Sequence, residues 1–510
     1  MKSPREERFD FNDLFTFEMA NNHQGSVEHG KKIIHAMGGI VRRHNIRAVI
    51  KFQFRDLDTF IHPEHQKKSD NKHVPRFIST RLSESDFSEL IAEARKENLI
   101  VMATPFDEVS VDTAERLGVD VLKVASCSAL DFPLLEKVAD AGKPVVVSFG
   151  GLAMKDIDRV VTFFDHRYVH FAIMHCVSIY PTPTEKLQLG QIAALKKRYP
   201  NVPVGFSTHE SPDNTENIQM AYAYGARIYE KHVGVAVDDI KLNAYSATPE
   251  QTEAWVSAWE RAKSAQGDEN KVLDDKERED LQSLMRGVFA VKPIKKGHII
   301  KKDDIYFAFP IQAEQLSSGR FIEGMKSDQD YKKDEVISEV IRVGALSKKE
   351  MVYSAIHAVK GMLNEAGIFV PQEFGVELSH HYGIENFEKY GAVIVDCINR
   401  EYCKKIIVQL PGQSHPNHHH IKKEEAFHIL AGEMELELDG RLKTLRPGDV
   451  QVIQRGVKHR FWTDSGVIFE EVSTTHFNDD SFYEDPKIRN LPREERKTKI
   501  VNWGRHQLDE

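Results

Sequence analysis

Two groups of residues in the sequence have types and spacings suited to chemistry, and they lie far apart in the chain. The first is a series of polar residues that end apolar runs in the N-terminal half, including Lys51, Lys123, His209 and His232. An unpaired ammonium group is costly inside an apolar strand, so the two lysines are predicted to be functional rather than solvated surface groups. From spacing alone, the two histidines fit a shared metal, general acid–base chemistry or a structural role.

The second group lies in the C-terminal part of the chain. His418 and His420 are two residues apart, so in a β-strand both imidazoles face the same side. Glu425 can return from the next strand, and His459 follows after a Pro-Gly turn. Three imidazoles and one carboxylate suit a divalent metal that keeps positions open for a substrate. The choice of ligand could shift by one residue to three neighbours: His415, His419 and Glu424.

Eight short apolar runs in the N-terminal half must position the first group. They are nearly continuous in apolar character, as in parallel strands that are buried on both faces, and amphipathic helical stretches separate them. Eight such repeats predict an α/β fold, a (β/α)8 TIM barrel whose strand ends converge at one rim. A doubly wound open sheet is the alternative, because periodicity cannot show closure. The polar segment 62–76 after the second run is expected to be a loop.

Two further units follow the barrel. Beyond residue 285, short strands joined by Lys-Lys-Gly and Lys-Lys-Asp turns form a small module. The C-terminal part alternates short strands, as in 434–438 before the turn Asp439-Gly440, which is typical of a small β-barrel or double-sheet roll. We therefore expect a barrel over 1–284, a small module over 285–345 and an all-β domain over 346–510.

The composition excludes several classes of protein. With 41% hydrophobic and 29% charged residues in 510, the chain is of ordinary globular type. No apolar run reaches the ~18–20 residues that cross a bilayer, and the charged N-terminus lacks the apolar core of a secretory signal. A net charge of -9 argues against nucleic acid as the main partner. Four scattered cysteines predict reduced, buried thiols, and hence a cytoplasmic protein without nucleic-acid or membrane partners.

The polar series of the barrel resembles the sialic acid synthase family, whose enzymes condense phosphoenolpyruvate with a sugar aldehyde. The most telling stretch is 175–183, which reads His-Cys-Val-Ser-Ile-Tyr-Pro-Thr-Pro, and 17–26 is similar to the family's opening Glu-x-x-x-Asn-His-x-Gly-Ser. Further matching stretches follow in the expected order: 50–53, 103–106, 122–126, 147–150, 205–209 and 230–232. The module at 286–345 resembles the antifreeze-like (SAF) domain of this family.

The resemblance implies roles for these residues. His209 and His232 would hold a divalent ion, typically Mn2+ or Mg2+, that polarises the sugar's carbonyl. Protons would be handled by Glu18 or by water at the metal. The SAF domain of one subunit would cap the barrel of its partner, which implies a domain-swapped homodimer. Glu18, Gln53 and Tyr180 would orient the acceptor's hydroxyls. Six residues would bind the phosphate and carboxylate of phosphoenolpyruvate: Lys51, Thr104, Lys123, Ser126, Ser148 and Ser207.

Three departures from the family pattern concern the sugar half of the site. Ser178 stands where the family has Asn, and Asn243 is the nearest polar candidate for an acidic acceptor contact. Phe309 stands where the SAF domain normally sends an arginine toward the substrate's N-acyl group. We therefore expect a condensation that gives a sialic-acid-like 3-deoxy-ulosonic acid and phosphate, with a shorter 3-deoxy-ulosonate as the alternative product.

The C-terminal unit resembles cupins, including metal-binding sugar isomerases, through the spacing of His418, His420, Glu425 and His459. The resemblance implies a divalent metal, either Zn2+, Mn2+, Fe2+ or Ni2+. One hypothesis is that this cupin isomerises a sugar for the barrel, and the alternative is a non-catalytic sugar sensor. A cupin with an empty or purely structural site is a further alternative, since cupins host many activities. Retention of both lysines and both histidines in the barrel argues against a catalytically dead scaffold.

Overall fold

The structure, a computed structural model, describes residues 8–237, 240–267, 272–338, 348–371 and 373–503. The chain falls into two compact units, Met1–Val272 and Leu273–Glu510, which are described separately below. In the described part of the chain, no helix combines the length and the hydropathy needed to cross a membrane.

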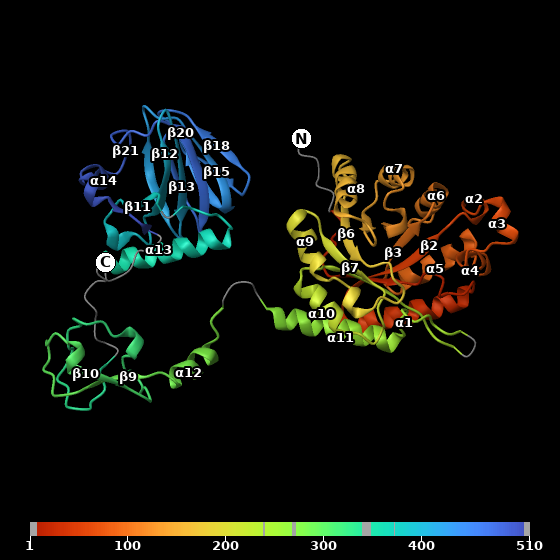
Figure 1. Ribbon diagram of the computed structural model, residues 1–510, viewed down its shortest axis with the longest axis horizontal. Coiled ribbons are helices and arrows are strands. Elements are labelled where there is room, and N and C mark those ends of the chain that lie inside the picture. Colours follow the sequence, from red (N-terminus) through yellow and green to blue (C-terminus); the bar gives the residue numbers. More distant parts are fainter. Residues whose placement is uncertain (1–7, 238–239, 268–271, 339–347, 372, 504–510) are drawn as a thin grey trace. The chain divides into compact units, whose positions relative to one another are not determined.

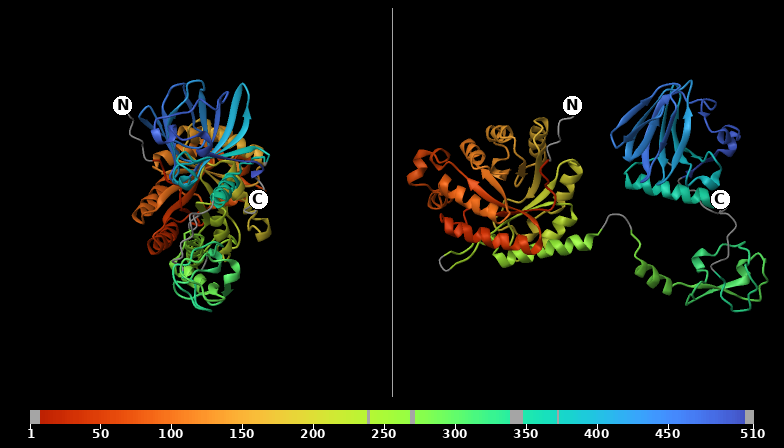
Figure 2. Two further views of the ribbon diagram at one scale, coloured as in Figure 1. Left: turned by 90° about the vertical axis from the view of Figure 1, so that its left-hand side faces the viewer. Right: turned by 180° about the vertical axis from the view of Figure 1, so that it is seen from behind.

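The first unit is a closed barrel of eight parallel strands in the order β1 to β8 (Figure 1). Because β8 pairs with β1, closure is established and the predicted TIM barrel is confirmed over the open sheet. Helices lie around the strands in the right-hand view of Figure 2. The strands are β1 (Leu14–Glu18), β2 (Arg47–Phe54), β3 (Ile100–Pro105), β4 (Val121–Val124), β5 (Val145–Ser148), β6 (Phe171–Cys176), β7 (Val204–Thr208) and β8 (Ile228–His232).

The alternation of side chains along each strand explains why the polar residues meet. An apolar layer that includes Val49, Val121 and Ile228 is fully buried in one core cluster. Side chains two residues apart on a strand point the same way, so the residue two positions beyond each of these faces the same side. Those residues are Lys51, Lys123 and Glu230, at the carboxyl-terminal halves of their strands. The apolar layer therefore carries a polar layer above it, at the rim.

Three of the helices around the barrel show clear capping residues at their first turn. Ser26 caps α1 (Val27–His44), and Ser83 and Thr248 form capping boxes at α5 (Glu84–Lys96) and α11 (Pro249–Gln266). The other surrounding helices are α6 (Glu108–Arg116), α7 (Phe132–Asp140), α8 (Met154–His166), α9 (Gly190–Arg198) and α10 (Glu216–Ala223).

The expectation of a loop over 62–76 is wrong, because the segment is largely helical. The structure has α2 (Leu57–Phe60), α3 (Pro63–Lys67) and α4 (His73–Ser79) here. His62 caps α3, and Pro63 occupies its first turn, where a missing N–H costs nothing. These helices are four, five and seven residues long, so they are too short for the window of about 11–18 residues over which hydrophobic periodicity is read.

The second unit begins with α12 (Asp275–Ser283) and a two-stranded antiparallel sheet of β9 (Gly287–Ala290) and β10 (Ile305–Ala308). A small core that includes Val288, Ile300 and Ile337 supports this sheet. The predicted turns occur at Gly297 and Asp334, both with positive φ. The division of the chain into three domains stays a prediction.

The C-terminal part is all-β, as predicted, and consists of a seven-stranded and a five-stranded sheet. The order is β18-β15-β20-β13-β12-β11-β22 in one and β17-β16-β19-β14-β21 in the other. Helix α13 (Lys348–Glu365) packs its apolar residues against the larger sheet (Figure 1). The strands are β11 (Gly375–Ser379), β12 (Ala392–Asn399), β13 (Tyr402–Gln409), β14 (Ser414–His419), β15 (Glu425–Gly432), β16 (Met434–Leu438), β17 (Arg441–Leu445), β18 (Val450–Ile453), β19 (His459–Trp462), β20 (Val467–Thr474), β21 (Phe482–Tyr483) and β22 (Lys497–Ile500).

Candidate active site and candidate metal centre

A cavity of about 790 Å³ lies at the carboxyl-terminal rim of the barrel. The structure brings every residue that the sequence predicted for the barrel site into the lining of this one cavity. They come from all eight strands and the loops that follow them, as expected where barrel enzymes keep their active sites. The thirteen residues are Glu18, Lys51, Gln53, Thr104, Lys123, Ser126, Ser148, Ser178, Tyr180, Ser207, His209, His232 and Asn243.

Lys51 lies at the centre of a buried charge network. Its Nζ is 2.7 Å from Glu18 Oε2 and 2.7 Å from Glu230 Oε2, and all three side chains are almost fully buried. Burial alone would lower the pKa of Lys51, but the two carboxylates raise it above its ordinary value. The lysine therefore keeps its positive charge inside the barrel, where a bare ammonium would be too costly.

Lys123 has a weaker hold on its proton. Its Nζ donates to Ser148 Oγ at 2.6 Å and lies 4.0 Å from Glu230 Oε2. Burial lowers the pKa of Lys123 to about 8. The nearby charge of Lys51 also lowers this pKa, whereas the charge of Glu230 raises it. Near neutral pH this side chain is a cation whose charge is only partly compensated by the protein. It is thus prepared to bind an anion.

His209 and His232 end neighbouring strands β7 and β8, and their ring centroids are 5.3 Å apart. Burial lowers the pKa of both histidines to about 3. The nearby His232 lowers the pKa of His209 further, and Lys51 lowers that of His232. Both rings are therefore neutral at neutral pH. His209 Nδ1 donates to the Val177 carbonyl at 3.1 Å, which leaves its Nε2 lone pair free. His232 Nδ1 is buried and has no hydrogen-bond partner in the part of the chain that the structure describes. Two neutral imidazoles with free ring nitrogens fit a shared divalent cation.

The hydroxyl groups of the cavity form a second set of polar contacts. Ser207 donates to Glu230 Oε1 at 3.0 Å, and Ser126 Oγ accepts from the Gly150 amide at 2.8 Å. Thr104 Oγ1 is buried and has no hydrogen-bond partner among the described groups. A side chain at Gly150 would collide with the Ser178 hydroxyl, so the glycine keeps this wall open. The hydroxyl of Thr104 can therefore be satisfied by a ligand.

Among the lining residues that were not predicted as site residues, Glu230 and Arg55 are both charged and lie in the cavity wall. Glu230 was expected at the rim with His232 but was given no role, although it lies two residues before His232 and so shares its face of β8. Arg55 follows β2, two residues beyond Gln53, and donates to Gln53 Oε1 at 3.0 Å. Its guanidinium lies 3.7 Å from the Phe106 ring centroid and 4.1 Å from that of Phe77, and burial lowers its pKa to about 10. The period-two pattern could have found both residues.

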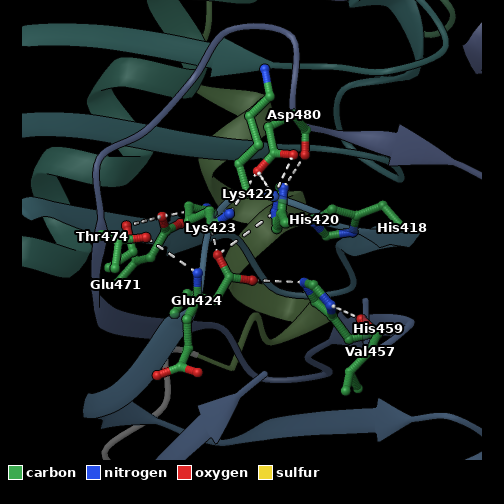
Figure 3. A network of polar contacts seen from close by, with 12 residues as sticks. His418, His420, Lys422, Lys423, Glu424, Val457, His459, Glu471, Thr474 and Asp480 are labelled. Atoms are coloured by element: carbon green, nitrogen blue, oxygen red, sulfur yellow. Dashed lines mark hydrogen bonds and ion pairs between the residues drawn. The ribbon is translucent and has the colours of Figure 1, made fainter. Parts of the chain in front are cut away.

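The predicted cluster of the C-terminal part is also assembled. The ligand atoms of four buried residues, His418, His420, Glu425 and His459, lie within 4.8 Å of one another. His418 and His459 face each other with ring centroids 4.1 Å apart. Figure 3 shows the three imidazoles approaching one another, with the Lys423 ammonium nearby. The role of the four as metal ligands stays a prediction.

The hydrogen bonds of the three imidazoles fix their tautomers. Each Nδ1 lies at a backbone carbonyl, that of Pro416 for His418, Asp480 for His420 and Val457 for His459. A carbonyl only accepts, so each Nδ1 carries the proton and each Nε2 lone pair is free. Metal-bound histidines have this arrangement. His459 Nε2 and Glu425 Oε1 are 2.9 Å apart without an aligned hydrogen bond, so the donor set fits a divalent metal.

Glu425 is further held by a buried lysine. Lys423 Nζ lies 2.5 Å from Glu425 Oε2 and 2.7 Å from Glu471 Oε1. Burial alone would raise the pKa of Glu425, but Lys423 holds it well below its ordinary value, so the carboxylate is ionised. The three alternative ligands lie outside the cluster: His415 stacks on Phe461, His419 stacks on Phe482, and Glu424 is exposed.

Fold and site together define a TIM-barrel protein whose rim cavity is lined by two buried lysines and two histidines, followed by an all-β unit with a His/Glu cluster. The NeuB family matches residues 45–271, and the cupin domain family matches residues 406–470. An uncharacterized protein of Methanocaldococcus jannaschii is 31% identical over 318 residues, which cover 62% of this chain and 90% of that protein. The chain belongs to the NeuB family and has a C-terminal cupin domain.

Two further relatives illustrate the family. The N,N'-diacetyllegionaminic acid synthase of Campylobacter jejuni is 26% identical over 346 residues, which cover 64% of this chain and 99% of the synthase. A solved structure from Chromobacterium violaceum, assigned as a candidate spore coat polysaccharide biosynthesis protein E, is 42% identical. It covers 64% of this chain and 99% of its own, with a TM-score of 0.63.

Proposed function

We propose that the barrel condenses phosphoenolpyruvate with a sugar aldehyde to give a nonulosonic acid, a 3-deoxy-ulosonic acid of the sialic-acid type, and phosphate. The observation that carries the proposal is the single cavity that joins Lys51 and Lys123 to the pair His209 and His232. Two ammonium groups beside several hydroxyls suit a small polyanion such as phosphoenolpyruvate. The synthase named among the relatives supports the same reaction class.

The residues of the cavity account for each part of this reaction. Lys51, Lys123 and the surrounding hydroxyls bind the phosphate and carboxylate, and Glu18 with Gln53 orients the acceptor. The methylene carbon of phosphoenolpyruvate forms a bond to the aldehyde carbon, and the aldehyde oxygen takes a proton. Water adds to the former enol carbon, whose bond to the phosphate oxygen then breaks. A divalent cation held by His209 and His232, Mn2+ or Mg2+, would supply Lewis acidity for the carbonyl.

The acceptor half of the site supports finer proposals. Ser178, Tyr180 and Asn243 line the cavity where the acceptor would lie. Tyr180 is half-exposed, and its ring centroid is 4.2 Å from that of His209, so it can stack beside a sugar at the cation. We also propose that the module around β9 and β10 is an SAF domain that caps the barrel of a second subunit in a homodimer. A measurement of the molar mass by light scattering would test the homodimer.

The test of the condensation uses the full chain with MnCl2, a panel of aldoses and phosphoenolpyruvate that carries 18O in the bridging oxygen. We expect phosphate release that depends on one class of aldose, with 18O retained in the phosphate because the C–O bond breaks. The mass of the product then gives the chain length, which separates a nonulosonate from a shorter 3-deoxy-ulosonate. Phosphate release at the same rate without any aldose would refute the proposal.

A second candidate activity belongs to the cupin. The cluster of His418, His420, Glu425 and His459 favours it, because a metal held there could bind adjacent oxygens of a sugar. We propose sugar isomerisation, with sugar sensing as the alternative. The full chain, incubated with metal and candidate sugars in deuterium oxide, should place deuterium at C1 or C2 of a substrate. The His459→Gln variant should lose this exchange. If the cupin is a sensor, neither the wild-type chain nor the variant should show exchange.

A further inference from the structure

A lysine on the inner face of the cupin has no role in the metal cluster. On β13, Cys403, Lys405 and Ile407 are buried on one face, while Lys404 points to the other. Ile407 belongs to the core between the sheets, so Lys405 faces the same interior. Its side chain is only 5% exposed, and it lines the cavity of about 320 Å³ that also contains His418, His420 and Glu425. A buried ammonium at this position requires compensation.

Within the described residues, this ammonium has no close ion-pair partner. No carboxylate oxygen of the described residues lies within 4.0 Å of Lys405 Nζ, although Glu471 and Asp396 are its cross-strand neighbours. Glu471 is instead paired with Lys423 at 2.7 Å. Lys405 Nζ is not fully enclosed by protein atoms, so it stays accessible from the cavity. Its remaining compensation can come from a ligand there.

Arg496 provides a second cation of the same kind. It lines the cavity before β22, and its guanidinium lies over the Tyr483 ring at 5.4 Å from the centroid. Its Nε is buried without a hydrogen-bond partner, and no carboxylate of the described residues lies within 4.0 Å of its guanidinium. Two cations without ion-pair partners therefore line the cavity that holds the candidate metal ligands.

We propose that the cupin cavity binds a small hydroxylated anion, whose carboxylate or phosphate group pairs with Lys405 and Arg496 while its hydroxyls reach the His418–His459 cluster. The lining holds five lysine or arginine side chains against four carboxylates, and a bound divalent metal adds two further positive charges. A neutral sugar would leave both cations unpaired. The cavity has the volume of a small-molecule site, and this inference does not depend on the reaction in the barrel.

Isothermal titration calorimetry of the full chain in MnCl2 tests the proposal with three probes: D-gluconate, D-glucose 6-phosphate and the neutral polyol D-glucitol. We expect at least one anion to bind and D-glucitol to bind at least tenfold more weakly. Binding of gluconate alone identifies a carboxylate site, and binding of glucose 6-phosphate alone identifies a phosphate site. Lys405→Met should weaken the bound anion about tenfold or more, the loss expected for a charge-assisted bond.

Lys404→Met is the matched control, because it removes the same charge from the outer face of the same strand. Lys404 pairs with Glu470 there at 2.6 Å, so its loss should leave the dissociation constant unchanged. Any binding of the anion to the barrel is the same in all variants, so it does not affect the difference between Lys405→Met and Lys404→Met. If Lys405→Met does not fold, Arg496→Gln gives the same measurement. The proposal is overturned if no anion binds the wild-type chain, if D-glucitol binds as tightly, or if the folded cavity variants bind like the control.

Discussion

Glu230 links the two lysines of the barrel site, and Glu230→Gln tests whether it sets the charge of Lys123. Glu230 Oε2 lies 4.0 Å from Lys123 Nζ, which corresponds to about 4 kcal/mol at an effective dielectric constant of about 20. This is an upper bound of about three pKa units, because water and neighbouring groups rearrange. We expect the pKa of Lys123, about 8 in the wild type, to fall by at least about one unit.

The assay is the pH dependence of kcat/KM for phosphoenolpyruvate, which reports groups of the free enzyme. Only the protonated lysine attracts the anion, so activity should decline as pH rises through the pKa of Lys123. The alkaline limb should therefore move from near pH 8 to about pH 7 or below in Glu230→Gln. Ser207→Ala is the control, because it removes a hydrogen bond to Glu230 and keeps the charge. Identical alkaline limbs in Glu230→Gln and the wild type would refute the reasoning.

The same substitution should lower the free energy of unfolding by about 3–5 kcal/mol at neutral pH, as for a broken buried ion pair. Burial alone would raise the pKa of Glu230, but Lys123 and Lys51 lower it below its ordinary value of 4.5. Its stabilising contribution is thus complete above pH 4.5 and is lost as the pH falls below that value. The difference between the variant and the wild type should shrink in acid, which urea unfolding at several pH values would measure.

Three further predictions concern single side chains. Lys51→Met should abolish phosphate release and lower the free energy of unfolding by about 3–5 kcal/mol at pH 7. Part of this stability should return in acid, because the carboxylate partners of Lys51 become protonated. Urea unfolding at several pH values would measure the change. His232→Gln and His459→Gln should each lose one bound metal by elemental analysis, and only the first should lose aldose-dependent phosphate release. Arg55→Gln, near the rim, should raise the KM of the acceptor about tenfold and leave that of phosphoenolpyruvate unchanged in steady-state kinetics.

The barrel site was predictable because two regular patterns fix it. Strand periodicity sets which residues face inward, and closure brings the carboxyl ends of all eight strands to one rim. Lys51 and Lys123 were found because charged residues interrupt runs that are otherwise apolar. Glu230 follows the same rule and was expected at the rim, but it was given no role there because only His232 was interpreted as a ligand. The ion pairs themselves depend on side chains from three strands, and no local pattern encodes those distances.

The helices over 57–79 show where the local patterns fail. They are four, five and seven residues long and bury little surface, since Leu57 is the one buried residue in the three helices. Hydrophobic periodicity reports burial, so it does not detect helices that bury little surface. Arg55 illustrates the consequence, because its aromatic neighbours, Phe77 and Phe106, come from α4 and from the loop after β3. The period-two pattern places Arg55 on the same side as Gln53, but these aromatic contacts became visible only with the structure.

In the cupin, the sequence revealed the histidines of the cluster but not the buried lysine beside them. Its histidines have a fixed spacing, whereas Lys405 is the second of two adjacent lysines and resembles a solvated surface pair in the sequence. Alternation along β13 separates the two: Lys404 meets Glu470 outside, and Lys405 enters the cavity without a close partner. The rule that singled out Lys51 and Lys123 in the barrel thus applies here as well, once the register is known. The proposed anion sites share one feature, an interior lysine whose charge nearby carboxylates compensate only in part, Lys123 in the barrel and Lys405 in the cupin.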